Sequence, residues 1–229
     1  MVKAIIFDMD GLVIDSEAGY VAAWRQTALA MGYLIDEDFA LGLSGANAEQ
    51  VKSYLLEKLG NDFDLARFSE LSTDYWLAHV EQYGIAVKHG FFSLLELIQQ
   101  QNLAFCLATN SRRLQALRCL KLAGLENVFS NVIARDDVVR GKPAPDLFLK
   151  AAEVLGYPIA DCLVLEDSPI GIAAAVAAGA RCFYLPSQVV IDPWASQQAM
   201  GVFDDLEQVA FELMQLCKQG LENGRRAVV

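Results

Sequence analysis

The stretch Lys3–Glu17, KAIIFDMDGLVIDSE, constrains what this chain can fold into more than any other stretch. It opens with an apolar run, Ala4–Phe7, that is rich in β-branched and aromatic side chains and so favours a buried strand. Asp8 and Asp10 follow, and because alternate residues of a strand project to one side, both carboxylates are predicted to face one spot. Like charges so close resist burial, so the pair implies a bound cation or a shifted pKa, with a plain acidic turn as the alternative.

Composition limits the classes of function. The 229 residues are 54% hydrophobic and 21% charged, which is typical of a globular protein with one sizeable core. Since 18 Lys and Arg stand against 29 Asp and Glu, the formal charge is -11, and neither nucleic acid nor membrane is an expected partner. Five scattered cysteines and the lack of a bilayer-length apolar run predict a cytoplasmic protein, taken as a monomer by default.

Strand and helix patterns alternate over the second part of the chain. The predicted strands are 103–108, 131–133, 162–168 and, as the last clear one, 181–185, with helices predicted at 91–101, 113–123, 145–155 and 171–178. Such alternation indicates a parallel α/β sheet. Residues 16–84 instead carry helical patterns, at 17–31, 47–59 and 65–82, and no convincing strand. We therefore predict a Rossmann-like α/β core made of residues 1–15 and 86–229, with residues 16–85 inserted as a helical domain.

Polar side chains follow several of these strands. Ligands bind beyond the carboxyl ends of the strands in parallel α/β sheets, so these side chains are expected to converge at one edge. They are Asp8 and Asp10, then Thr109, Asn110 and Ser111, then Glu166 and Asp167, with Lys142 in a loop that can approach the same edge. Carboxylate oxygens suit Mg²⁺, while an ammonium group, a hydroxyl and backbone N–H groups suit phosphate, which together favour phosphoryl transfer.

Each of these residues also has a purely structural interpretation when it is taken alone. Thr109–Ser111 could begin a helix, Lys142 could be an ordinary surface lysine, and Glu166–Ser168 could cap a helix. Their shared placement at strand ends argues for a common site.

In their order along the chain, Asp8-x-Asp10-Gly11, Thr109, Lys142-Pro143 and Glu166-Asp167 resemble the four motifs of the haloacid dehalogenase superfamily. The resemblance implies a helical cap domain at 16–85 and Mg²⁺ as cofactor. It assigns Asp8 as nucleophile, Asp10 as general acid and base, and Thr109 and Lys142 to phosphate binding. The metal is assigned to Asp8, Asp10 through its carbonyl, and Asp167, with Glu166 either supporting these ligands or replacing one of them. The positions of Asn110 and Ser111 beside Thr109 predict that they also bind phosphate.

The segments DGLVIDSE, GKPAPD and LEDSPIGI resemble the branch of β-phosphoglucomutase and sugar-phosphate phosphatases. The mutase has a cap histidine where this chain has Tyr20, and a cap arginine where this chain reads Gly45–Glu49. We therefore expect a phosphatase that hydrolyses a small sugar or sugar-acid phosphate through an aspartyl phosphate. A sugar-phosphate mutase and a non-catalytic phosphate-ligand binding protein remain the alternatives.

Overall fold

The computed structural model describes residues 2–43, 48–187 and 191–226. The chain forms two compact units, Met1–Ile14 with Val87–Val229, and Asp15–Ala86. It passes from one unit to the other at β2 (Ile14–Asp15) and returns at β3 (Ala86–Val87), and these two short strands pair with each other. The two units are described separately below.

A parallel sheet forms the centre of the larger unit. Within the described residues it has six strands in the order β5-β4-β1-β6-β7-β8, and every neighbouring pair is parallel. The strands are β1 (Ala4–Phe7), β4 (Ala104–Ala108), β5 (Val132–Ile133), β6 (Cys162–Glu166), β7 (Arg181–Tyr184) and β8 (Gly201–Val202). The predicted α/β fold class is therefore confirmed.

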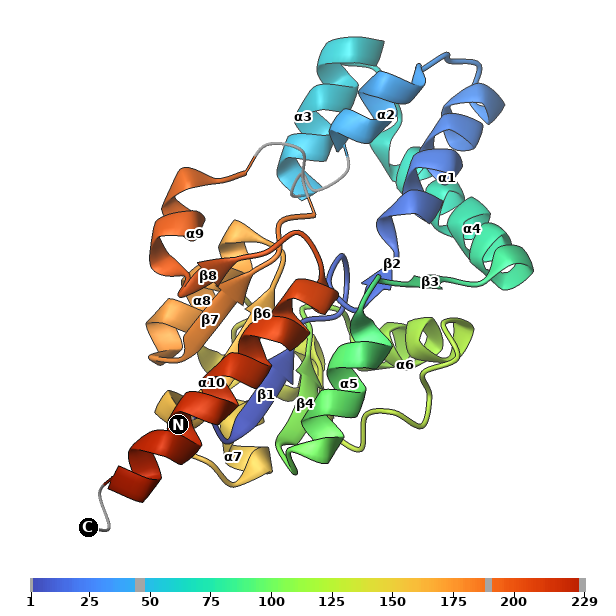
Figure 1. Cartoon of the computed structure of the whole chain (residues 1–229). Coiled ribbons are helices and arrows are strands. Elements are labelled where there is room, and N and C mark those ends of the chain that lie inside the picture. Colours follow the sequence, from blue (N-terminus) through green and yellow to red (C-terminus); the bar gives the residue numbers. More distant parts are fainter. Residues whose placement is uncertain (1, 44–47, 188–190, 227–229) are drawn as a thin grey trace. The chain divides into compact units, whose positions relative to one another are not determined.

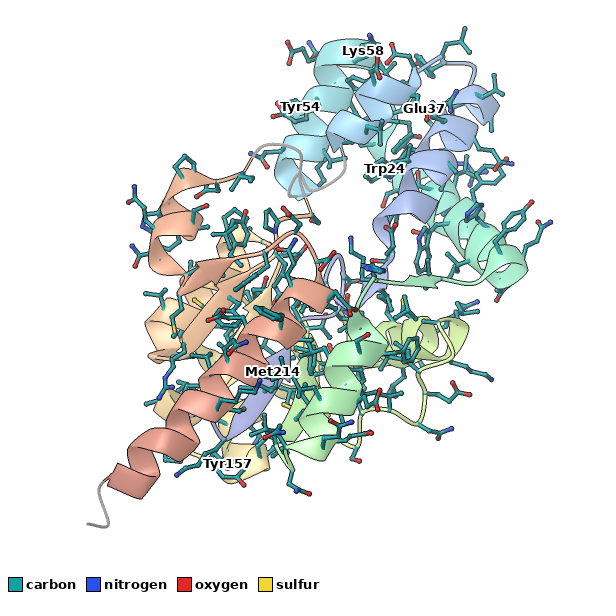
Figure 2. The ribbon with its side chains drawn as sticks, viewed as in Figure 1. Trp24, Glu37, Tyr54, Lys58, Tyr157 and Met214 are labelled. Carbon is teal, nitrogen blue, oxygen red and sulfur yellow. The ribbon has the colours of Figure 1, made fainter. Side chains whose placement is uncertain are left out.

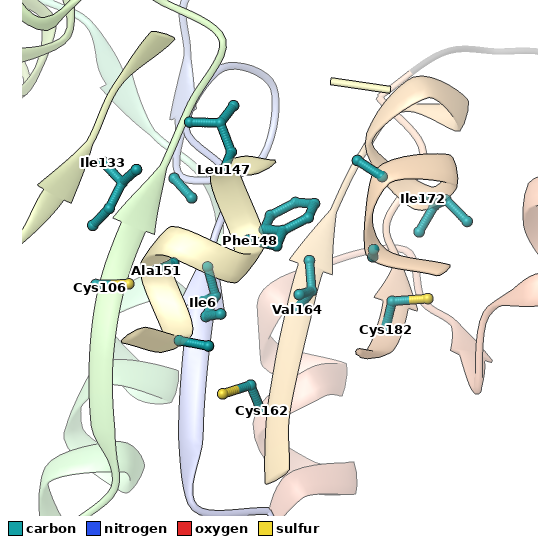
Figure 3. Close-up of a cluster of buried hydrophobic side chains, with 14 of the residues drawn as sticks. Ile6, Cys106, Ile133, Leu147, Phe148, Ala151, Cys162, Val164, Ile172 and Cys182 are labelled. Atoms are coloured by element: carbon teal, nitrogen blue, oxygen red, sulfur yellow. The ribbon is translucent and has the colours of Figure 1, made fainter. Parts of the chain in front are cut away.

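Helices cover both faces of this sheet, which explains why β1 is apolar at every position. On one face Ile6 belongs to one buried apolar cluster with Phe148 of α7 (Asp146–Leu155) and Ile172 of α8 (Pro169–Ala178), which Figure 3 draws. On the other face the ring of Phe7 lies 5.9 Å from that of Phe91, on α5 (Phe91–Gln100). Figure 1 shows α10 (Leu206–Arg226) beside α5 on that face, and α6 (Arg113–Leu122) follows β4 along the chain.

Two details of the larger unit differ from the sequence-based prediction. The strand predicted over 162–168 ends at Glu166, because Ser168 instead caps α8. Beyond the last predicted strand the chain adds α9 (Pro193–Gln198), β8 and α10.

The smaller unit is helical in its described residues. It contains α1 (Glu17–Ala30), α2 (Glu37–Leu43), α3 (Ala48–Leu59) and α4 (Leu65–Tyr83), of which α2 was not predicted. A core of buried apolar side chains joins the four helices: Ala28, Ile35, Ala40, Leu43, Leu55, Phe63 and Phe68. Figure 2 shows Trp24 on α1 and Lys58 on α3 in this unit. Residues 44–47, which include most of the segment compared with the mutase arginine, lie outside the described residues.

Tyr20 lies in an aromatic stack inside the smaller unit. Its ring is stacked on that of Trp76 with 4.9 Å between ring centroids, and Trp24 lies 5.7 Å away on the same helix. The Trp76 indole N–H donates to the Ser16 carbonyl at 3.3 Å, which ties α4 to the start of α1. The Tyr20 ring therefore packs against two aromatic rings of its own unit.

Across the described ranges, every helix is too short or too polar to cross a membrane.

Candidate active site

Three carboxylates meet where two central strands end. The Asp8 N–H donates to the Leu165 carbonyl at 3.0 Å, so the end of β1 lies beside the end of β6, which leads into Glu166 and Asp167. Carboxylate oxygens of Asp8, Glu166 and Asp167 all lie within 4.8 Å of one another. The chain leaves β1 for β4 and β5 on one side and returns to β6 on the other, so this cluster marks the point where the strand order reverses, the usual ligand site of such sheets.

Lys142 reaches into this cluster from the loop before α7. Its ammonium group pairs with Asp8 Oδ1 and with Glu166 Oε1. The ammonium nitrogen also lies 4.9 Å from the ring centroid of Phe148, and only 3% of the Lys142 side chain is exposed. Lys142 is therefore a buried charge held by two carboxylates, unlike an ordinary surface lysine.

Glu166 is engaged through both of its oxygens. While Oε1 pairs with Lys142, Oε2 accepts from the backbone N–H of Asp167 at 3.0 Å and from that of Ser168 at 3.1 Å. The Ser168 hydroxyl also donates to Oε2 at 3.0 Å and accepts from the Gly171 N–H at 3.1 Å. Ser168 is thus the N-cap of α8, as the capping interpretation of this segment predicted, and Glu166 ties that cap to Lys142.

A glycine allows Asp167 to approach the end of β1. Gly11 has φ +82°, in the left-handed region, and a Cβ atom there would lie 2.1 Å from Asp167 Oδ2. Any side chain at Gly11 would displace this carboxylate from the cluster.

Asp10 lies beside the end of β4. The Ser111 hydroxyl donates to Asp10 Oδ2 at 2.8 Å, and the Thr109 hydroxyl lies 3.5 Å from the same oxygen. The Ser111 N–H in turn donates to the Thr109 hydroxyl at 2.9 Å. The two hydroxyls that were predicted to contact phosphate therefore orient Asp10.

Asn110 and Arg135 hold the loop that carries Lys142. The Asn110 side chain hydrogen-bonds to the Lys142 main chain. The Arg135 guanidinium donates to the carbonyls of Val138 at 3.0 Å and Val139 at 3.2 Å. This role of Arg135 was not predicted, because its partners are backbone atoms whose positions depend on the fold.

Burial and neighbouring charges shift the pKa values of Asp8 and Lys142 in this cluster. Burial raises the pKa of Asp8 to about 8, with Lys142 opposing the shift and the Glu166 and Asp10 charges adding to it. Burial acts to lower the pKa of Lys142, but the Asp8 and Glu166 charges outweigh it and the net shift is upward. Carboxylates so close together, offset by one ammonium group, suit a hard divalent cation with oxygen ligands. The donor set therefore fits the metal that the sequence predicts.

A family model and several proteins of known sequence or structure match the chain. The family model, described as haloacid dehalogenase-like hydrolase, matches residues 2–179. A "Phosphorylated carbohydrates phosphatase" from Thermotoga maritima is 30% identical over 187 residues, covering 80% of this chain and 84% of its own. The "Beta-phosphoglucomutase" of Bacillus subtilis is 30% identical over 183 residues, covering 77% and 80%.

Solved structures share the fold over almost the whole chain. A haloacid dehalogenase family hydrolase from Deinococcus radiodurans R1, with bound phosphate and sodium, superposes with a TM-score of 0.78. It is 27% identical, and the match covers 93% of this chain and 96% of that one.

Proposed function

Because the chain belongs to the haloacid dehalogenase-like hydrolase family, we propose that it is a magnesium-dependent phosphatase of a sugar or sugar-acid phosphate. The observation that carries the proposal is the buried group of Asp8, Lys142, Glu166 and Asp167 at the ends of β1 and β6. Unaided phosphate monoester hydrolysis is so slow that enzymes supply rate factors of up to about 10²¹, chiefly by positioning and charge neutralisation.

In the proposed reaction Asp8 and Asp10 share the covalent chemistry. A carboxylate oxygen of Asp8 attacks phosphorus, and the bond from phosphorus to the ester oxygen breaks as Asp10 gives that oxygen its proton. Asp10 then takes a proton from water, which attacks the phosphorus of the aspartyl phosphate and releases inorganic phosphate and the Asp8 carboxylate. The hydroxyl of Ser111, 2.8 Å from Asp10 Oδ2, keeps the acid and base oriented.

The proposed ligands of Mg²⁺ are Asp8, Asp167 and the main-chain carbonyl of Asp10, with Glu166 as an alternate ligand. Both Glu166 oxygens already have partners within the protein, which is why Glu166 is assigned only as an alternate ligand. When bound, the ion supplies positive charge next to the transferring phosphoryl group. Lys142 supplies a second positive charge from the protein itself.

We assign phosphate contacts to the end of β4 and substrate selection to the helical unit. Thr109 and the backbone N–H of Asn110 hold phosphate oxygens. The Ser111 hydroxyl has one proton, so it donates to phosphate when Asp10 is protonated and to Asp10 when Asp10 is ionised. The unit Asp15–Ala86 is the proposed cap, which excludes water and selects the substrate.

The substrate class rests on the relatives. One is named as a phosphatase of phosphorylated carbohydrates and another as β-phosphoglucomutase, so phosphorylated sugars are the first compounds to test. The stacking of Tyr20 on Trp76, where the mutase has a histidine, supports hydrolysis over phosphate return.

Phosphate release from a panel of sugar phosphates and sugar-acid phosphates, measured with Mg²⁺ and with EDTA, tests the proposal. We expect release with Mg²⁺ and none with EDTA. On β-glucose 1-phosphate a phosphatase yields glucose, whereas a mutase yields glucose 6-phosphate. Tight binding of panel members without any phosphate release would contradict the proposal and support a binding protein.

A further inference from the structure

Asn110 grips the main chain of Lys142 at two points. Its Oδ1 accepts from the Lys142 N–H at 2.9 Å, and its Nδ2 donates to the Lys142 carbonyl at 3.2 Å. The two residues are 32 positions apart, so this pair of bonds joins the end of β4 to the loop before α7. Both polar atoms of the amide are used on one residue, which fixes the position and the tilt of the Lys142 backbone together.

Close packing around Gly141 supports the same conclusion independently. A Cβ atom at Gly141 would lie 2.4 Å from Asn110 Oδ1 and 2.7 Å from Arg135 Cδ. Arg135 also donates its own backbone N–H to the Ser111 carbonyl at 3.0 Å. The loop thus packs closely against Asn110 and Arg135. Arg135 is itself hydrogen-bonded to Ser111, just after the end of β4.

The position of this backbone matters because of the side chain it carries. Lysine ends in a compact point charge on a flexible stem, so its reach depends on where the main chain is held. The Lys142 ammonium contacts Asp8 and Glu166 in a site where its side chain is almost completely buried. A displacement of about 1 Å at a reacting centre can cost roughly 10²-fold in rate.

We propose that the Asn110 side chain is a positioning residue that sets the place of the Lys142 ammonium group beside Asp8. This role rests on the proposed function, in which Lys142 neutralises charge on the transferring phosphoryl group. It is distinct from the contact assigned to the backbone N–H of Asn110, since the side chain acts on the reaction only through Lys142.

A double-mutant cycle tests this dependence. We expect Asn110→Ala to lower kcat roughly 10- to 100-fold, with KM little changed, because the charge acts in the transition state. In a Lys142→Ala background the same substitution should change kcat by less than about twofold. An equal loss of kcat in both backgrounds, or no loss from Asn110→Ala alone, overturns the positioning role.

Two further measurements keep the test decisive. If Asn110→Ala fails to fold, the cycle is run with Asn110→Asp, which keeps the acceptor for the Lys142 N–H and loses the donor to its carbonyl. Its loss of kcat should likewise vanish in the Lys142→Ala background. A Lys142→Ala enzyme with wild-type kcat contradicts the part given to Lys142 in the proposed function, and so is distinguished from a failure of Asn110 alone.

Discussion

At the scale of single residues, the burial of Asp8 lowers the free energy of unfolding at pH values where an exposed carboxyl group loses its proton. Its pKa rises from 3.8 to about 8, so the folded state retains a proton that the unfolded chain has already lost over that interval. The free energy of unfolding of the metal-free protein therefore falls as pH rises from about 4 to about 8 on account of this group. Asp8→Asn removes this penalty.

The resulting prediction concerns thermal stability in EDTA. We expect Asp8→Asn to melt at a higher temperature than the wild-type protein, with the difference growing between about pH 5 and about pH 8. Differential scanning calorimetry at several pH values measures it. A difference that stays constant or shrinks with rising pH would show that the burial of Asp8 carries no such cost.

Gly171 permits the close approach of α8 to Glu166. A Cβ atom there would lie 1.8 Å from the Glu166 carboxyl carbon, so Gly171→Ala should cost about 1–3 kcal/mol of unfolding free energy and lower kcat by displacing the partner of Lys142. Gly42→Ala is the matched control. Gly42 lies in α2, and among the described residues no atom lies within 4 Å of a Cβ placed there, so that substitution should add about 0.5–1 kcal/mol. Urea unfolding compares the two, and equal effects would refute the steric account.

The sequence indicated the charged residues of the site better than the groups that hold them. Asp8, Glu166 and Asp167 follow strands that apolar runs predict, and parallel strand ends meet at one edge. Asn110 hydrogen-bonds to the backbone of Lys142, and Arg135 hydrogen-bonds to the backbone of the same loop. Such contacts depend on the folded path of the chain, which residue types and spacing do not encode locally.

At the scale of elements, Ser168 joins the start of α8 to the site. Its hydroxyl accepts from the Gly171 N–H and donates to Glu166, so Ser168→Ala should cost roughly 1–2 kcal/mol and also lower kcat. Asp192, which caps α9 through the Ala195 N–H at 2.8 Å, provides the control. Asp192→Ala should lower the stability by a similar amount and leave kcat unchanged. Loss of kcat in both variants would mean that stability alone explains the effect.

Most of the elements that the sequence predicted have strong local signals, but the two-residue strand β5 was predicted and the 21-residue helix α10 was not. Strands β1 and β4 are apolar throughout, β6 is apolar up to Glu166 and β7 is apolar after Arg181, and each was predicted. Strand β8 has only two residues, which pair with the edge strand β7, so tertiary pairing rather than local pattern creates it. Helices α2 and α9 have seven and six residues, too few for a clear helical period.

At the scale of the whole molecule, the packing of helices on both faces of the sheet should protect the thiols. Cys106, Cys119, Cys162 and Cys182 are buried, and burial raises the pKa of Cys119 to about 12 and those of Cys162 and Cys182 to about 11. In the native protein we expect Ellman's reagent to react rapidly with no thiol other than that of Cys217. In guanidinium it should react with all five thiols. Rapid reaction of several thiols without denaturant would contradict the packed core.

The central claim is that Asp8 becomes covalently attached to phosphate, and trapping that species tests it most directly. Acetyl phosphate is a suitable donor because its leaving group needs no proton, and Asp10→Asn should slow the water step so that the phosphoenzyme accumulates. After an acid quench, borohydride converts an aspartyl phosphate to homoserine, which peptide mass spectrometry locates. We predict homoserine at position 8 in Asp10→Asn and turnover reduced roughly 10⁴-fold or more in Asp8→Asn. Release of acetate by Asp10→Asn with residue 8 unmodified, or wild-type turnover by Asp8→Asn, would contradict the account.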